Sequence, residues 1–159
     1  MTTQAPAAAS VAIAEMLIRK PVADVFQAFV DPAITTKFWF TRSSGPLTPG
    51  AKVTWEWEMY GLSVPVTVKA LEQNERILIE WSGGGSTTTV EWRFLPRPDG
   101  TFVKVTNGGF RGDADEILSQ VRNGTEGFAL VLAGLKALLE HDVRLNLVRD
   151  RHPDGLTTK

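Results

Sequence analysis

The sequence predicts one α+β domain, in which an antiparallel sheet of about six strands is covered by a long C-terminal helix. Two hydrophobic periodicities support this fold class. Between residues 52 and 106 apolar and polar side chains alternate, which is typical of strands with one buried face. Between residues 113 and 143 apolar side chains recur at steps of three, four or seven, as on one face of a helix. The chain has 159 residues and 43% of them are hydrophobic, which is enough for one core.

The first elements precede the alternating region. Residues 12–19 are typical of a strand, and a short amphipathic helix follows Pro21. Asp31 is typical of a helix N-cap, and Pro32 is typical of the first helical position. We therefore expect a second short helix that carries Phe38 and Trp39 at its end. The domain is expected to span residues 12–143. The ends, residues 1–11 and 150–159, lack periodicity and are expected to be flexible.

Gly and Pro separate the remaining strands, and their short connections imply antiparallel neighbours. The expected strands are residues 52–60, 63–71, 76–81, 88–95 and 101–106. The apolar stripe of the C-terminal helix consists of Ile117, Val121, Phe128, Leu132, Leu135 and Leu139. Small residues flank this stripe, namely Gly127, Ala133, Gly134 and Ala137. They either let a neighbouring backbone approach closely or leave room for another molecule.

Four of the five tryptophans lie at alternating strand positions, and each has a glutamate beside it: Trp55, Trp57, Trp81 and Trp92. Successive strand residues point to opposite faces, so one face of the sheet is expected to be aromatic and the other acidic. The same alternation places Glu56, Glu58, Tyr60 and Arg93 on the solvated face. The aromatic face is either a packed core or the lining of a pocket, and large rings beside a helix rich in Gly and Ala favour a cavity.

Composition excludes several functions. The formal net charge is -1 and no long basic run occurs, which argues against nucleic-acid binding. No apolar run reaches the roughly 20 residues of a membrane helix, so we expect no membrane partner and a cytoplasmic location. There is no cysteine, and the two histidines, His141 and His152, have no recognisable ligand spacing around them. We therefore expect no metal, no cofactor and no catalytic residue.

A series of short motifs runs through the domain. They are Pro21-Val22-Ala23-Asp24-Val25-Phe26-Gln27-Ala28-Phe29, Asp31-Pro32, Trp39, Pro49-Gly50, Glu80-Trp81, Asp99-Gly100-Thr101, Gly109-Phe110 and residues 135–139. In their order and spacing the chain resembles the START-like, helix-grip superfamily, specifically the family related to the activator of the heat-shock protein 90 ATPase. The resemblance implies a curved antiparallel sheet that grips a long C-terminal helix, with an apolar cavity between them that often holds a hydrophobic small molecule.

Two positions depart from many of these relatives. Asn107 stands where they carry a histidine near the end of the last strand, and Gly127-Phe128 stands where they carry a Gly-Trp pair. An activity that depends on that histidine is therefore not implied for this chain.

The sequence as a whole predicts that a small hydrophobic or amphipathic molecule binds between the sheet and the C-terminal helix, without catalysis. The expected cavity-lining residues are Phe38, Trp39, Trp55, Trp57, Trp81, Trp92, Phe94, Phe110, Phe128, Leu132 and Leu135. One alternative is a polyketide-cyclase or aromatase type of enzyme, with Tyr60 as its acid. Another is a protein-interaction module in the stress response, whose partner is a chaperone or a second copy of the chain in a homodimer.

Overall fold

The computed structural model describes residues 10–82 and 86–156. Residues 1–9 and 157–159, which belong to the ends expected to be flexible, lie outside the described residues. The described chain contains a seven-stranded antiparallel sheet with the order β1-β7-β6-β5-β4-β3-β2. Its strands are β1 (Ala12–Ile18), β2 (Arg42–Ser43), β3 (Lys52–Trp57), β4 (Leu62–Glu72), β5 (Arg76–Trp81), β6 (Thr88–Arg97) and β7 (Gly100–Gly108). The predicted fold class is confirmed, with one strand more than expected.

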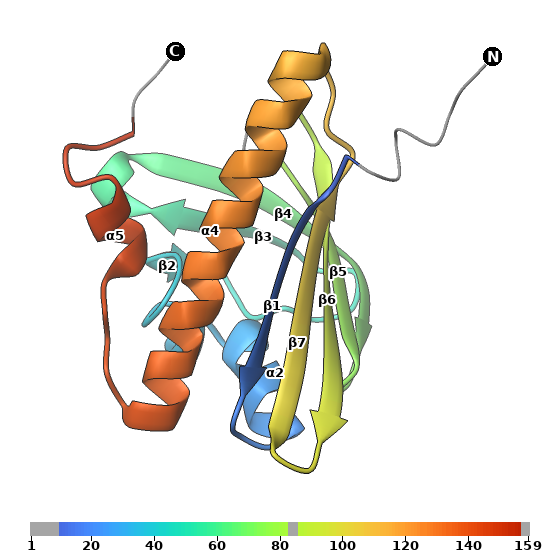
Figure 1. The fold of residues 1–159 in the computed structure, drawn as a ribbon, viewed down its shortest axis with the longest axis vertical. Coiled ribbons are helices and arrows are strands. Elements are labelled where there is room, and N and C mark those ends of the chain that lie inside the picture. Colours follow the sequence, from blue (N-terminus) through green and yellow to red (C-terminus); the bar gives the residue numbers. More distant parts are fainter. Residues whose placement is uncertain (1–9, 83–85, 157–159) are drawn as a thin grey trace.

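The sheet is strongly curved. β3 and β4 cross the view almost at right angles to β1 and β7, and the long helix α4 (Ala114–His141) lies in the space that the sheet encloses (Figure 1). The first strand pairs with the last, from Ala12 opposite Asn107 to Ile18 opposite Thr101. This pairing makes β1 a border strand of the sheet.

The two short helices after β1 are α2 (Val22–Val30) and α3 (Pro32–Thr35). α2 buries its apolar face, and α3 begins where Asp31 Oδ1 accepts a hydrogen bond from the Ala33 amide at 2.9 Å. α3 is shorter than expected and ends before Phe38 and Trp39. One further turn follows it, because the Trp39 amide donates to the Thr35 carbonyl at 3.0 Å. This turn directs both rings into the interior, where they are buried.

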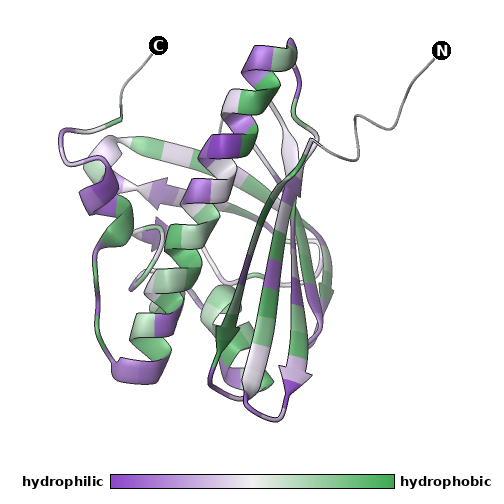
Figure 2. Cartoon of the chain, in the orientation of Figure 1, coloured by the Kyte–Doolittle hydropathy of each residue, from purple (hydrophilic) through white to green (hydrophobic). Residues whose placement is uncertain are grey.

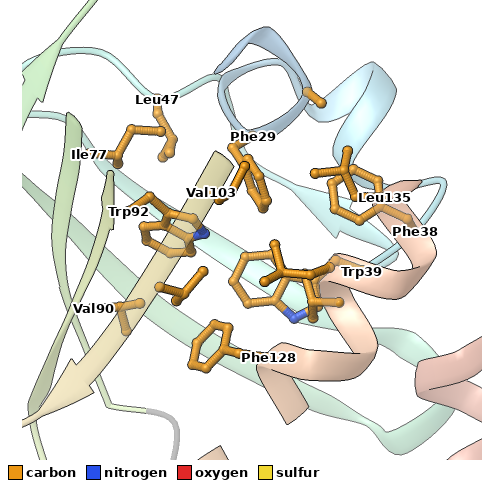
Figure 3. Packing of buried hydrophobic residues seen from close by; sticks show 14 of the residues in the cluster. Phe29, Phe38, Trp39, Leu47, Ile77, Val90, Trp92, Val103, Phe128 and Leu135 are labelled. Carbon is orange, nitrogen blue, oxygen red and sulfur yellow. The ribbon is translucent and has the colours of Figure 1, made fainter. Parts of the chain in front are cut away.

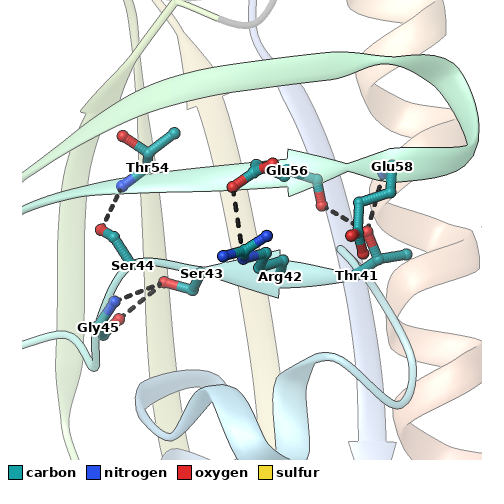
Figure 4. A network of polar contacts seen from close by, with 8 residues as sticks. All are labelled: Thr41, Arg42, Ser43, Ser44, Gly45, Thr54, Glu56 and Glu58. Atoms are coloured by element: carbon teal, nitrogen blue, oxygen red, sulfur yellow. Dashed lines mark hydrogen bonds and ion pairs between the residues drawn. The ribbon is translucent and has the colours of Figure 1, made fainter.

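The strand β2 was not predicted, because it has only two residues. Side chains beside it supply the contacts that a longer strand would make with its backbone (Figure 4). Thr41 Oγ1 accepts from the Glu58 amide, and Ser44 Oγ accepts from the Thr54 amide, both at 2.9 Å. These bonds fix the loop before β3 against the sheet edge.

β3 ends three residues earlier than expected. Glu58–Tyr60 form a single 3₁₀ turn, η1, and Gly61 then adopts a left-handed conformation with a φ of 62°. Glu58 is exposed, as expected, but neither Glu58 nor Tyr60 continues the strand, and Tyr60 is only partly exposed. The turn instead places Tyr60 against a short helix, α5 (Leu147–Arg151), which the sequence did not predict.

The two faces of the sheet differ as expected. Trp55, Trp57 and Trp92 are buried in one core with residues of α2 and α4. Figure 3 shows Phe29, Trp39 and Phe128 around Trp92. Glu56, Glu80 and Glu91 lie on the outer face in ion pairs, of which the shortest joins Arg76 Nε to Glu91 Oε2 at 2.6 Å.

The two halves of α4 differ in burial. A capping box starts the helix, in which Asp113 Oδ1 accepts from the Glu116 amide at 2.8 Å and Glu116 Oε1 accepts from the Asp113 amide at 2.9 Å. All of its buried residues lie between Phe128 and Leu138. The C-terminal half, at the bottom of the view, is mostly hydrophobic, whereas the N-terminal half, at the top, has several hydrophilic turns (Figure 2). Ile117 and Val121, expected on the same stripe, are only partly buried.

Candidate functional site

A groove of about 990 Å³ lies between the N-terminal half of α4 and the aromatic face of the sheet. One wall comes from α4 and another from β3, β4 and β5, and residues in and after α5 form its rim. The groove is open to solvent. Its aromatic lining consists of Trp39, Trp57, Trp81, Phe110 and Phe128.

Three of these rings form a continuous apolar floor. The ring centroids of Trp39 and Phe128 are 5.7 Å apart, those of Trp81 and Phe128 5.9 Å, and those of Trp39 and Trp81 6.0 Å. Tilted and edge-to-face contacts at these distances are favourable for aromatic pairs. The floor is thus held in place by its own contacts and offers ring faces and edges to a bound molecule.

The structure divides the expected cavity-lining residues into three groups. Five of them, the aromatic residues named above, line the groove. Phe38 lines a second hollow of about 420 Å³, which also borders Trp39 and α5. The remaining residues belong to the closed core and line neither hollow: Trp55, Trp92, Phe94, Leu132 and Leu135. The groove is therefore smaller than the aromatic face, because part of that face is covered by α2 and the C-terminal half of α4.

The buried end of the groove contains a small polar group. Asn107 Nδ2 donates to the Thr89 carbonyl oxygen at 2.7 Å and to Thr88 Oγ1 at 3.1 Å. Trp81 Nε1 donates to the same Thr88 oxygen, also at 3.1 Å. Thr88 and Asn107 are 7% and 4% exposed, and both line the groove.

The rim of the groove is formed by ionisable residues. Arg151 Nε and Glu126 Oε1 form an ion pair of 2.9 Å between α5 and α4. The ring of His152 lies edge-on to that of Tyr60, with the centroids 6.2 Å apart. Tyr60 Oη donates to the Val148 carbonyl at 2.7 Å, and burial raises the pKa of this tyrosine. These contacts hold α5 over one end of the groove.

The glycines of α4 show both uses that small residues allow. At Gly134 an added Cβ would meet the Phe38 carbonyl oxygen at 3.4 Å, which is close packing. At Gly127, which lines the groove, an added Cβ would meet nothing within 4 Å. Gly134 therefore permits close approach, and Gly127 leaves space.

Sequence reasoning missed several lining residues. Asn107 follows Val103 and Val105 at alternating positions, so its place on the apolar face was available from the pattern, although it was noted only as a departure from relatives. Arg151 and His152 were assigned to a loose end, and no periodic signal in that segment indicated α5. Whether residues 150–159 are flexible stays a prediction, but residues 150 and 151 belong to that helix.

Within residues 10–82 and 86–156, no helix combines the length and apolar character needed to cross a membrane. No protein with a curated description matches the sequence. Among solved structures, a protein from Staphylococcus saprophyticus is 31% identical, with 85% of this chain and 95% of that chain covered and a TM-score of 0.71.

Two more distant structures share the fold. DynU16, a protein of the dynemicin biosynthetic locus, is 21% identical, with a TM-score of 0.74 and coverage of 85% of this chain and 49% of its own. The Aha1 dimer from Colwellia psychrerythraea is 18% identical, with a TM-score of 0.69 and coverage of 82% and 96%. The family model of Activator of Hsp90 ATPase homolog 1-like proteins matches residues 19–140. The chain belongs to this family, as its motifs and its helix-grip fold together indicate.

Proposed function

We propose that the protein binds a small hydrophobic or amphipathic molecule in the groove between α4 and the sheet, without chemistry of its own. The observation that carries this proposal is the open hollow of about 990 Å³ over the floor of Trp39, Trp81 and Phe128. Ligand pockets typically measure roughly 300–1,000 Å³ and are mostly apolar with a few polar groups. The groove lies at the upper end of this size range. Its floor is apolar, and polar side chains of α4, including Ser119, Gln120 and Asn123, belong to its lining as well.

The groups that a cyclase would need have other partners. Tyr60 Oη donates to a backbone carbonyl, and Arg93 pairs with Glu91 on the outer face at 3.3 Å. Glu56 lies 3.8 Å from Arg42 on the same face. The ionisable side chains that line the groove, Glu126, Arg151 and His152, lie at its rim. Ligand binding therefore has more support than catalysis.

A role as a protein-interaction module has less support. Large exposed apolar side chains of the described residues include Ile13, Leu95 and Leu118, which come from β1, β6 and α4. No observation places them in one patch. A chaperone partner and a homodimer therefore remain expectations of the sequence, and the dimer of the Colwellia psychrerythraea protein is a property of that protein.

A substitution at Gly127 tests the groove directly. Gly127→Leu adds an apolar side chain where nothing lies within 4 Å of the new Cβ, so the fold is kept and the groove is filled. We expect naphthalene and 1-anilinonaphthalene-8-sulfonate to change the tryptophan fluorescence of the native protein saturably, since Trp39, Trp57 and Trp81 line the groove. In Gly127→Leu the affinity should fall by about tenfold or more, or roughly 1.4 kcal/mol.

Ala129→Leu is the matched control, because Ala129 is an exposed residue of the same helix that does not line the groove. Its affinity should equal that of the native protein. A flat fluorescence response of the native protein to both compounds, or equal affinities for Gly127→Leu and Ala129→Leu, would contradict the proposal.

A further inference from the structure

The hydrogen bonds at the buried end of the groove have directions that the chemistry of their atoms determines. The amide nitrogen and the indole nitrogen are donors only. Asn107 therefore uses both of its N–H groups, one on the Thr89 carbonyl and one on Thr88 Oγ1. The orientation of this amide is fixed, because the opposite one would place Asn107 Oδ1 against the Thr89 carbonyl oxygen at 2.7 Å.

The proton of the Thr88 hydroxyl then has no hydrogen-bond acceptor in the described part of the chain. Its oxygen accepts from Asn107 Nδ2 and Trp81 Nε1, both at 3.1 Å, so both lone pairs are used. Among the described residues, no acceptor takes the hydroxyl proton. A buried hydroxyl without an acceptor costs free energy, so this proton favours an acceptor atom in the groove.

Asn107 supplies the complementary atom. Its Oδ1 accepts no hydrogen bond from the described residues. This oxygen is not fully buried, so a ligand atom can reach it. Gly124 of α4 packs closely beside it, since an added Cβ would meet Ala12 Cβ at 3.0 Å and this oxygen at 3.3 Å, so a ligand reaches the oxygen from the groove that Asn107 lines. The amide nitrogen and oxygen of Asn107 share one carbon, so the free acceptor lies next to the free Thr88 donor.

We infer that Thr88 and Asn107 recognise a neutral hydroxyl group, of an alcohol or a phenol, at the inner end of an otherwise apolar ligand. The ligand oxygen accepts the Thr88 proton, and the ligand O–H donates to Asn107 Oδ1. This inference rests on the proposed function and specifies its ligand class.

Other polar groups fit the pair less well. A carboxylate has no proton for Asn107 Oδ1 and brings a negative charge against it. An ammonium group cannot accept from Thr88, and an ether or a ketone uses the Thr88 proton only. A hydroxyl satisfies both atoms at once, so the pair selects for the hydroxyl against these groups.

The test compares three ligands that share one ring system, measured by isothermal titration calorimetry on the full chain. Naphthalene makes neither hydrogen bond, 2-methoxynaphthalene can only accept, and 2-naphthol can do both. We expect 2-naphthol to bind about tenfold more tightly than naphthalene, with 2-methoxynaphthalene between them, because each net hydrogen bond strengthens binding a few-fold.

Thr88→Val removes the hydroxyl and keeps the shape of the side chain. It should reduce the advantage of 2-naphthol over naphthalene from about tenfold to about twofold. Thr88→Ser restores the hydroxyl and should restore the advantage, which guards against a loss of fold in Thr88→Val. Thr101→Val is the matched control: Thr101 is also a buried threonine, but its hydroxyl donates to the Lys20 carbonyl, away from the groove.

The outcomes separate the two proposals. If naphthalene binds and 2-naphthol binds no more tightly, the hydroxyl inference is overturned while ligand binding stands. The same inference fails if Thr88→Val keeps the full advantage of 2-naphthol. If none of the three compounds binds the native protein, the proposed function fails, and the ligand class fails with it.

Discussion

Trp92 is one of the two largest side chains that the described core buries fully, with 1% of its surface exposed. Its ring centroid lies 5.6 Å from that of Phe29, 5.9 Å from that of Trp39 and 6.1 Å from that of Phe128. Trp92→Ala would leave a cavity between α2 and α4 that neighbouring rings cannot fill. We expect the free energy of unfolding to fall by about 3–5 kcal/mol, measured as a shift of the urea midpoint.

The indole nitrogen of Trp92 makes Trp92→Phe an informative control for this prediction. Among the described residues, Trp92 Nε1 is the buried side-chain atom that has no hydrogen-bond partner. Phenylalanine keeps most of the ring contacts and removes this unpaired donor, so its cost should stay well below that of alanine. Equal losses for the two variants would show that ring packing is not the source of the stability.

Residue types alone could not separate the groove from the core. Trp81 and Trp92 both follow a glutamate in a strand and both lie on the aromatic face, so the sequence treats them alike. Their difference comes from contacts distant in sequence: Phe29 of α2 covers Trp92, whereas Trp81 borders the groove. The aromatic face was therefore predictable, but its division into filled and open parts was not.

At the scale of elements, α5 depends on few contacts. Tyr60 Oη donates to the Val148 carbonyl at 2.7 Å, and Arg151 pairs with Glu126. Tyr60→Phe removes the hydrogen bond and keeps the ring. We expect local opening of residues 147–151 to become easier by about 1 kcal/mol, seen as roughly fivefold faster amide hydrogen exchange there.

The core provides a second measurement. Exchange in β6 and β7 requires global unfolding, which also breaks the Tyr60 bond, so it should accelerate by no more than the factor seen in residues 147–151. If exchange in residues 147–151 is unchanged in Tyr60→Phe, the Tyr60 bond does not hold α5.

The elements that the sequence predicted well are those with a long periodic signal. The strands of residues 76–81 and 88–95 were placed within two residues, because both are rich in β-branched and aromatic residues and turn residues bound them. The predicted end of β3 was wrong, because apolar and polar residues still alternate in η1 while the backbone there forms a 3₁₀ turn. β2 and α5 are too short for any period, and contacts with distant residues hold them.

At the scale of the whole molecule, Glu140 joins the end of β1 to the end of α4. Its Oε2 accepts from the Arg19 amide at 2.8 Å and from Lys136 Nζ at 2.7 Å, and Lys136 Nζ also donates to the Leu17 carbonyl at 2.8 Å. Burial alone would raise the pKa of Glu140, but these two hydrogen bonds and the positive charge of Lys136 lower it below its ordinary value of 4.5.

This lowered pKa gives a pH-dependent prediction for Glu140→Gln. The carboxylate stabilises the fold fully above its ordinary pKa, and the contribution is lost as the pH falls through the lower folded value. We expect the variant to be less stable by about 1–2 kcal/mol at pH 7, with a gap that closes below pH 4.5 in urea unfolding curves. Glu15→Gln, at an exposed position of β1, should change stability little. A gap that persists undiminished at pH 3 would contradict the assignment.

The contact between α4 and β1 also determines how copies of the chain can meet. An uncovered border strand is a template on which another chain can add a strand of its own. Lys136 reaches the Leu17 carbonyl and Glu140 reaches the Arg19 amide, so the helix caps the backbone where β1 ends. The opposite border is β2, whose two residues are too few for stable strand addition. Addition of a strand from another chain is therefore disfavoured at β2 and at the end of β1.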